Sequence, residues 1–151
     1  MSKTNSWESD VLSLLFNNTD ATLIGDAAGL QNSAAAGSLY VSLHTADPGE
    51  AGTQLTSEAA YTSYARVAVA RSGAGWTVSG SAPTQVVNAA AITFPACTGS
   101  SSLVTHFGIG CVDLATGAGK LLYKGALTPN ITITTGITPQ IPLGGLVVTE
   151  D

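Results

Sequence analysis

Hydrophobic and polar side chains alternate with a period of two in two neighbouring stretches of this chain. In the first, LYVSLH at residues 39–44, Leu, Val and Leu alternate with Tyr, Ser and His, a pattern typical of a half-buried strand. The stretch leads into Asp47-Pro48-Gly49, where Pro48 presets φ for a type II turn and Gly49 accepts the positive φ that follows. Residues 64–71 alternate in the same way. The pattern therefore predicts two strands joined by a polar loop.

Short apolar stretches separated by Gly, Ser, Pro and Asn continue to the end of the chain. A series of such strands with turn residues between them is the signature of a β-sandwich or barrel. We therefore expect a mainly all-β fold, a Greek-key or jelly-roll-like β-sandwich over residues 38–149. The predicted strands are residues 38–44, 64–71, 75–79, 85–94, 103–111, 120–127, 131–135 and 146–149.

Apolar residues at helical spacing precede the strands. They are Trp7, Val11, Leu14 and Leu15. Asn5, followed three residues later by Glu8, matches a loose capping pattern, and the Asn-Asn-Thr-Asp run at 17–20 favours a turn. One amphipathic helix is expected over residues 6–16, followed by a loop over residues 20–37. Its apolar stripe either packs on its own sandwich or docks on another protein.

Charged residues make up only 10% of this 151-residue chain, far below the usual quarter. Residues 72–112 and 125–149 contain no Asp, Glu, Lys or Arg. A domain of this size can bury a full core, so we expect a single domain over residues 1–151. Because monomeric surfaces usually carry interspersed charge of both signs, the two uncharged stretches predict a surface covered by partners and a homo-oligomer.

The net charge of −5 disfavours nucleic acid as a partner, because phosphate contact needs clustered Lys and Arg. No apolar run approaches the roughly 20 residues of a membrane helix, and the polar first ten residues do not match a signal peptide. We therefore expect no membrane partner, and a protein kept in the cytoplasm until it assembles. In that reducing compartment Cys97 and Cys111 are expected to be buried free thiols.

Residues that could carry chemistry are few. His44, His106, Cys97 and Cys111 could together suggest a metal site, but no two of them have the close spacing of structural zinc ligands. The GAGK run at residues 117–120 lacks both the first glycine and the hydroxyl of a phosphate-binding loop. We expect no metal, no cofactor and no enzymatic activity.

Large amphipathic side chains are instead candidates for an interface, because they combine apolar area with a polar group. Arg66 and Arg71, set among Tyr, Val and Ala, could bind carboxylates of a neighbouring subunit. Arg66 could equally pair within its own chain with Asp47 or Glu58. The full set of interface candidates is Trp7, Tyr40, Tyr61, Tyr64, Arg66, Arg71, Trp76, His106 and Tyr123.

Six segments of the chain resemble a known family. They are MSKTNS at the start, LYVSLHTADPGE, YTSYARVAVAR, THFGIG, GKLLYKGAL and the closing LVVTED. On these segments the chain resembles small virion structural proteins of tailed bacteriophages and prophages, a family of capsid decoration (cement) or short tail-fibre-type proteins. The resemblance runs over most of the chain, and its motif residues are architectural rather than catalytic.

The resemblance implies a virion protein made in the host bacterial cytoplasm. The function we favour from the sequence is capsid decoration, in which a trimer binds the major capsid protein on the head surface and stabilises it. A symmetric oligomer suits this function because later contacts with the lattice become intramolecular. The alternative is a tail-associated or short tail-fibre protein that contacts tail proteins and takes part in host-surface attachment.

Overall fold

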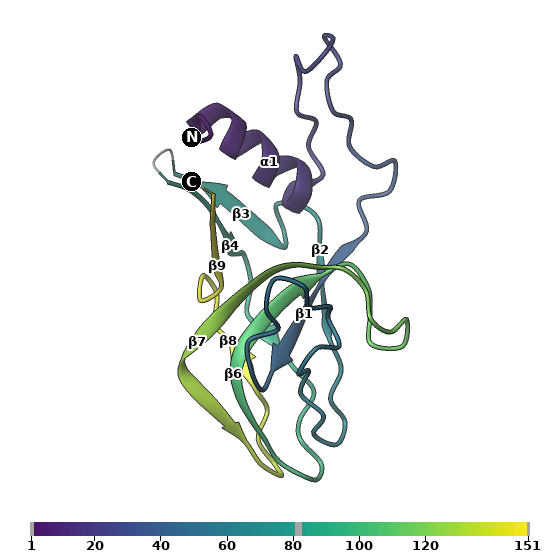
Figure 1. Cartoon of the computed structure of the whole chain (residues 1–151), viewed down its shortest axis with the longest axis vertical. Helices are drawn as coiled ribbons and strands as arrows, with labels where there is room; N and C mark the ends of the chain where they lie inside the picture. The colour runs from purple at the N-terminus through teal and green to yellow at the C-terminus, as the bar shows by residue number, and fades with distance from the viewer. Residues whose placement is uncertain (1, 81–82, 151) are drawn as a thin grey trace. The chain divides into compact units, whose positions relative to one another are not determined.

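The computed structural model describes residues 2–80 and 83–150, so Met1 and Asp151 of the expected domain lie outside the described residues. The described chain contains one helix and nine strands, which form sheets of order β2-β1-β6-β7, β3-β4-β9 and β5-β8 (Figure 1). The mainly β fold with one N-terminal helix is confirmed. The elements are α1 (Asn5–Asn17), β1 (Ser38–His44), β2 (Val67–Ala70), β3 (Trp76–Ser79), β4 (Thr84–Asn88), β5 (Ile92–Thr93), β6 (Ser102–Gly110), β7 (Leu121–Ile133), β8 (Gln140–Ile141) and β9 (Val147–Glu150).

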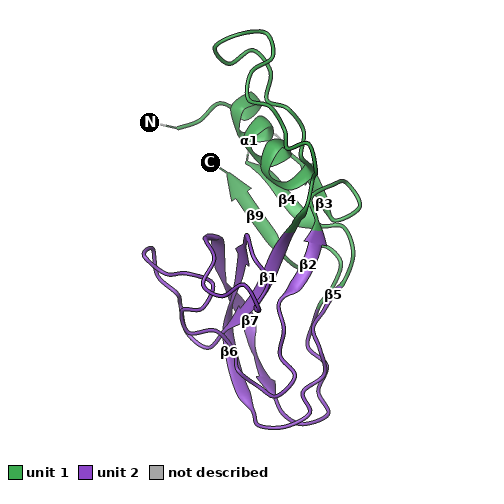
Figure 2. Ribbon diagram, turned by 90° about the vertical axis from the view of Figure 1, so that its right-hand side faces the viewer, with its two compact units in different colours: residues 1–38, 70–91, 141–151 green, residues 39–69, 92–140 purple. Residues whose placement is uncertain are grey.

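The chain divides into two compact units (Figure 2). Unit 1 comprises residues 1–38, 70–91 and 141–151, and unit 2 comprises residues 39–69 and 92–140. Each unit is therefore assembled from segments that are distant in the sequence.

Unit 1 is built from α1 and the antiparallel sheet β3-β4-β9, with α1 packed against β3 and β4. The Phe16 ring meets the Trp76 ring edge-on, with their centroids 4.9 Å apart, and both side chains are buried. The helix buries Glu8, Leu12 and Phe16, so the predicted stripe is wrong by one position. Because Glu8 is polar, this face of the helix lacks the regular apolar spacing that would reveal it in the sequence.

The ends of α1 lie within one residue of the predicted 6–16. Thr4, not Asn5, occupies the N-cap position, and its side chain makes no capping hydrogen bond, so the predicted capping by Asn5 is wrong. Asn18 ends the helix in the left-handed conformation, and its N–H donates to the Ser13 carbonyl. Asparagine tolerates this conformation better than most residues, and the predicted stop is confirmed.

In unit 2 the central strands are β1 and β6, which pair antiparallel from Tyr40 opposite Gly110 to His44 opposite His106. β1 has the predicted bounds. Its apolar residues Leu39, Val41 and Leu43 are buried as the alternation predicts, but Ser42 and His44 are buried as well. Both faces of β1 are therefore covered by protein.

Strand β7 departs from the prediction of two separate strands. It runs unbroken from Leu121 to Ile133 along the edge of the sheet and contains Pro129, which an edge strand tolerates because its outer N–H groups need no partner. Ile131 lies opposite Val104 whereas Ala126 lies opposite His106, so the residues between them bulge. The predicted strand 85–94 is in turn split into β4 and β5.

The irregular pairing also changes which side chains of β6 are buried. The alternation places Leu103 and Cys111 with the core, but Leu103 is exposed and Val104 is fully buried. Cys97 is a buried free thiol as predicted, whereas Cys111 is exposed, so that prediction is wrong for Cys111. The reason is that β6 ends at Gly110, and Cys111 already belongs to the following turn.

Candidate functional site

The loop that follows β1 covers one face of the β1-β6-β7 sheet with polar side chains. The loop begins with the predicted turn, in which Asp47 Oδ1 accepts from the Gly49 N–H at 2.8 Å. Its Gln54 side chain is fully buried, accepts from the Cys111 and Val112 N–H groups at 3.0 and 3.1 Å, and donates to the Val112 carbonyl. A Cβ on Gly110 would collide with Gln54. The glycines of β6 therefore make room for a polar layer above the sheet.

Arg66 and Glu58 form a buried ion pair next to this layer. The Arg66 side chain is fully buried, and its Nε and Nη2 donate to the two Glu58 carboxylate oxygens at 2.8 Å each. Its Nη1 donates to the carbonyls of Val112, Asp113 and Gly117 at 2.9–3.0 Å. Of the two alternatives that the sequence left open for Arg66, the structure shows the pair within its own chain, and the partner is Glu58.

Tyr64 joins the same network. Its hydroxyl donates to Glu58 Oε1 at 2.8 Å and accepts from the Leu43 N–H at 3.0 Å. Burial, together with the neighbouring Glu58 carboxylate, raises the Tyr64 pKa far above its ordinary value, and burial raises the pKa of Tyr61 to about 12. Both phenols therefore stay protonated and act as hydrogen-bond donors; Tyr61 donates to the Pro95 carbonyl.

Ser42 and His44 resemble the start of a catalytic pair. Ser42 Oγ lies 2.8 Å from His44 Nε2, but the opposite ring nitrogen, Nδ1, faces the Thr56 carbonyl at 2.8 Å rather than a carboxylate. A carbonyl can only accept, so Nδ1 carries the proton and Nε2 accepts from the serine. Both side chains are fully buried, so no substrate reaches the hydroxyl. The pair connects the loop to the sheet.

The burial of His44 predicts a pH-dependent stability. Desolvation lowers the His44 pKa below its ordinary 6.5, against the raising effects of the Thr56 carbonyl and Glu58, while Arg66 and His106 add to the lowering. The unfolded chain therefore binds this proton more readily, so the stabilisation is complete above about pH 6.5 and is lost as the pH falls below that value. Between pH 7.5 and 5, wild type should lose more stability in urea unfolding than His44→Gln, which lacks the titrating group. Equal losses in the two proteins would contradict the prediction.

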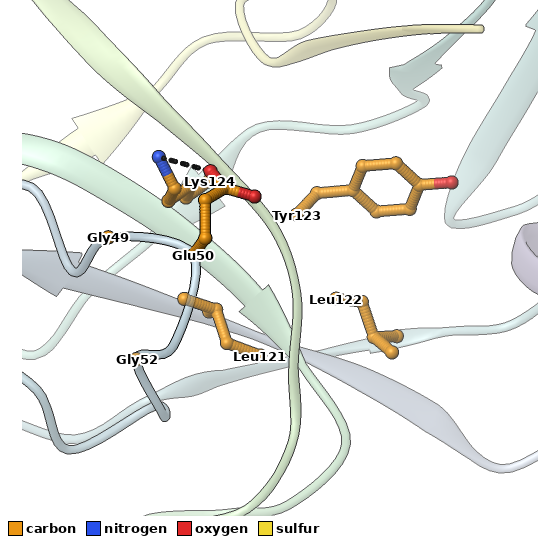
Figure 3. A pocket seen from close by; sticks show the side chains of 7 residues that line it. All are labelled: Gly49, Glu50, Gly52, Leu121, Leu122, Tyr123 and Lys124. Atoms are coloured by element: carbon orange, nitrogen blue, oxygen red, sulfur yellow. Dashed lines mark ion pairs between the residues drawn. The ribbon is translucent and has the colours of Figure 1, made fainter.

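A second cluster of charges lies at an open pocket of about 270 Å³ between the loop and β7. Lys124 Nζ lies 3.0 Å from Asp47 Oδ1 and 3.2 Å from Glu50 Oε1. Hydrogen bonding to Asp47 raises the Lys124 pKa. Figure 3 shows Leu121 and Lys124 pointing to the side of the Gly49–Gly52 loop and Tyr123 pointing away from it. The lysine thus fastens the loop to the edge strand.

A wider and more apolar pocket, the Leu55 pocket, opens elsewhere on unit 2. Its volume is about 360 Å³. The Tyr61 and Tyr64 rings on its wall meet edge-on at 5.3 Å, and Leu55 is 48% exposed. Its lining residues are Leu55, Glu58, Ala59, Ala60, Tyr61, Ser63, Tyr64 and Leu114. The pocket brings together two of the predicted interface residues, Tyr61 and Tyr64, beside the Glu58–Arg66 pair.

Arg71 binds within unit 1. Its Nε and Nη2 donate to the Leu15 and Leu14 carbonyls at 2.7 Å each, and its Nη1 donates to the Ala36 carbonyl at 3.0 Å. The last carbonyls of a helix have no partner inside the helix, and a cation there also complements the helix dipole. Arg71 therefore caps α1 and holds the segment that follows it.

The remaining interface candidates are spread over both units. Trp76 is fully buried in unit 1 beside Phe16, while Trp7 and Tyr40 are half-buried. Tyr123 lies at the Lys124 pocket, and half-buried His106 is hydrogen-bonded to Thr105 at 2.8 Å. Sequence reasoning missed Gln54 and Asn88, two fully buried amides that hold loops through backbone contacts. A single amide side chain between small residues does not form a repeating pattern, so the sequence does not show that it is buried.

Within residues 2–80 and 83–150, no group of three or more His, Cys, Asp or Glu side chains is placed to hold a metal ion. No helix in this part of the chain has the length and apolar character needed to cross a membrane. In unit 2 the buried or half-buried polar side chains described above hydrogen-bond to one another or to backbone groups; they include His44, Gln54, Glu58, Tyr64 and Arg66. They define a class of structure in which polar side chains hold loops on a sheet.

Comparison with known proteins agrees with that class. The profile of the family described as Podophage GP4 fiber I protein gp80 matches residues 3–149. The chain belongs to this family of phage structural proteins. No curated protein matches it. The family match confirms the resemblance to phage virion proteins and favours the tail-fibre alternative over capsid decoration.

Proposed function

We propose that this protein is a subunit of a phage tail fibre or tail-associated structure that takes part in attachment to the host surface. The observation that carries the proposal is the family match over nearly the whole chain, whose description names a fibre protein. The buried polar networks agree with it, because a structural subunit needs rigid loops rather than an accessible nucleophile. Its proposed partners are tail proteins and further copies of itself, not nucleic acid or a membrane.

The proposal includes the absence of enzymatic activity. The described Ser-His pair is buried inside unit 2, and two neighbouring exposed carboxylates, Asp47 and Glu50, are bound to Lys124. Purified protein incubated with host surface polysaccharide should therefore leave the polymer length unchanged. Shortening of the polymer would show that the chain is a depolymerase.

Location on the virion tests the proposal most directly. Gold-labelled antibody against the purified protein should decorate the tail or its fibres when intact virions are imaged by electron microscopy. Label spread evenly over the head would overturn the proposal and support capsid decoration instead. Virions that lack the gene are the matched control and should carry no label.

A further inference from the structure

An ordered arm projects from unit 1 between α1 and β1, and in both views it extends beyond the helix (Figures 1 and 2). We define the arm as residues 20–32. Its two sides exchange backbone hydrogen bonds between Ala21 and Leu30, at 3.0 and 2.8 Å. At its base, the Asn32 N–H donates to Asp20 Oδ1 at 2.6 Å. The arm is therefore held in one shape by its own hydrogen bonds.

The tip of the arm is apolar although it contacts little of the protein. Leu23 is 80% exposed, Ile24 is 37% exposed, and Leu30 on the returning side is 43% exposed. Leu23 also has φ of +64°, a conformation that leucine disfavours and asparagine tolerates. At this exposure the Leu23 side chain buries little apolar area within its own chain. The side chain is available to a partner.

The Leu55 pocket of unit 2 is a complementary surface on the same chain. A cavity of about 150 Å³ lined by aliphatic and aromatic groups already accepts a benzene molecule, so this pocket of about 360 Å³ has room for the arm tip. Its lining includes Tyr61, Tyr64 and Leu114 together with the partly exposed Leu55. Tyrosine-walled pockets are typical anchoring sites in protein interfaces.

Neither surface brings an unpaired charge into the contact. In the arm, Asp26 Oδ1 already accepts from the Ala28 and Gly29 N–H groups at 2.9 Å, and Asp20 holds Asn32. In the pocket, the Glu58 carboxylate is neutralised by Arg66. A buried unpaired charge is the usual obstacle to an apolar contact, and it is missing on both sides.

We propose that the arm tip of one copy, with Leu23 and Ile24, inserts into the Leu55 pocket of a second copy. The two surfaces are different patches of one chain, so the contact is heterologous and joins copies head to tail. Such contacts close into a ring, as in the trimer that the sequence predicts, or continue as an open stack. The occupant is a second copy because the complementary apolar surfaces belong to one sequence.

Leu23→Asn tests the proposal without endangering the fold. Asparagine accepts the left-handed conformation, so the variant should unfold at the same temperature as wild type or higher. Loss of one buried leucine should weaken self-association about 10- to 100-fold, measured by sedimentation equilibrium. Self-association unchanged from wild type, or a wild-type chain that stays monomeric over the whole concentration range, would overturn the proposal.

Cross-linking tests which surfaces meet. In a Cys111→Ser background, Thr22→Cys chains are mixed with differently tagged Ala60→Cys chains under mild oxidation. Thr22 is next to the arm tip and Ala60 lines the pocket, so a mixed disulfide dimer should form, and adding Leu23→Asn should abolish it. In the control, Thr132→Cys takes the place of Ala60→Cys, because Thr132 is exposed on β7 and does not line the pocket. Equal yields with Thr132→Cys would contradict the assignment.

This inference rests on the proposed function only in assuming a structural subunit, and the two fail separately. If Leu23→Asn and the cross-links show no contact while gold labels the tail, the fibre proposal stands and the arm proposal falls. If the contact is found while gold labels the head, the arm proposal stands and the fibre proposal falls.

Discussion

Arg66→Ala is expected to lower the free energy of unfolding by about 3–5 kcal/mol, the usual cost of breaking a buried ion pair from one side. The substitution leaves the Glu58 carboxylate without its cation. It also removes the Arg66 donor from the Asp113 and Gly117 carbonyls and leaves the Val112 carbonyl with Gln54 alone. Urea unfolding monitored by circular dichroism at pH 7.5 measures the loss.

Two further variants separate charge from geometry. Arg66→Lys keeps the positive charge but cannot donate to Glu58 and to the loop carbonyls at once, so its loss should be intermediate. Lys124→Ala breaks two ion pairs at the protein surface, where solvent screens the charges, and it should cost far less. An Arg66→Ala protein as stable as Lys124→Ala would show that the network does not stabilise unit 2.

Trp76→Ala is expected to destabilise unit 1 by about 3–5 kcal/mol, because it leaves a large cavity beneath α1. Trp76 is fully buried, and the edge-on contact with Phe16 is one of the ties between the helix and the sheet. The melting temperature by calorimetry and the far-ultraviolet helical signal should both fall.

Trp7 provides a matched control, because it is the other tryptophan and is only half-buried. Trp7→Ala should cost less than Trp76→Ala. Trp76→Phe should also cost less, since it keeps an aromatic ring and removes an indole Nε1 that has no partner among the described residues. Equal losses for Trp7→Ala and Trp76→Ala would place the core of unit 1 elsewhere.

The elements that the sequence predicted well are those with an unambiguous local signal. Strand β1 has the period-two alternation and a turn with Pro48 and Gly49, and its bounds were predicted to the residue. The helix stop at Asn18 follows from a side chain that tolerates the left-handed conformation. In these places local preference and the final fold agree.

The errors occur where tertiary contacts override the local pattern. Glu8 occupies a buried helix position, which moved the predicted stripe by one residue. The bulge in β7 reverses the burial of Leu103 and Val104, and no alternation can show a bulge that depends on the partner strand. For the Arg66 network, the sequence could supply candidate carboxylates but could not choose Glu58. The sequence predicts the arm only as a loop, because its exposed leucines follow neither the helical nor the strand period.

The order in which the segments alternate between the two units has a practical consequence for cutting and fusing this chain. The backbone passes from one unit to the other four times, at residues 38/39, 69/70, 91/92 and 140/141. No single cut can therefore release either unit intact, and a truncated gene cannot encode one of them alone. The described residues at both ends of the chain belong to unit 1. A reporter fused at either end is thus attached to the unit that carries the arm, and labelling unit 2 requires an internal position.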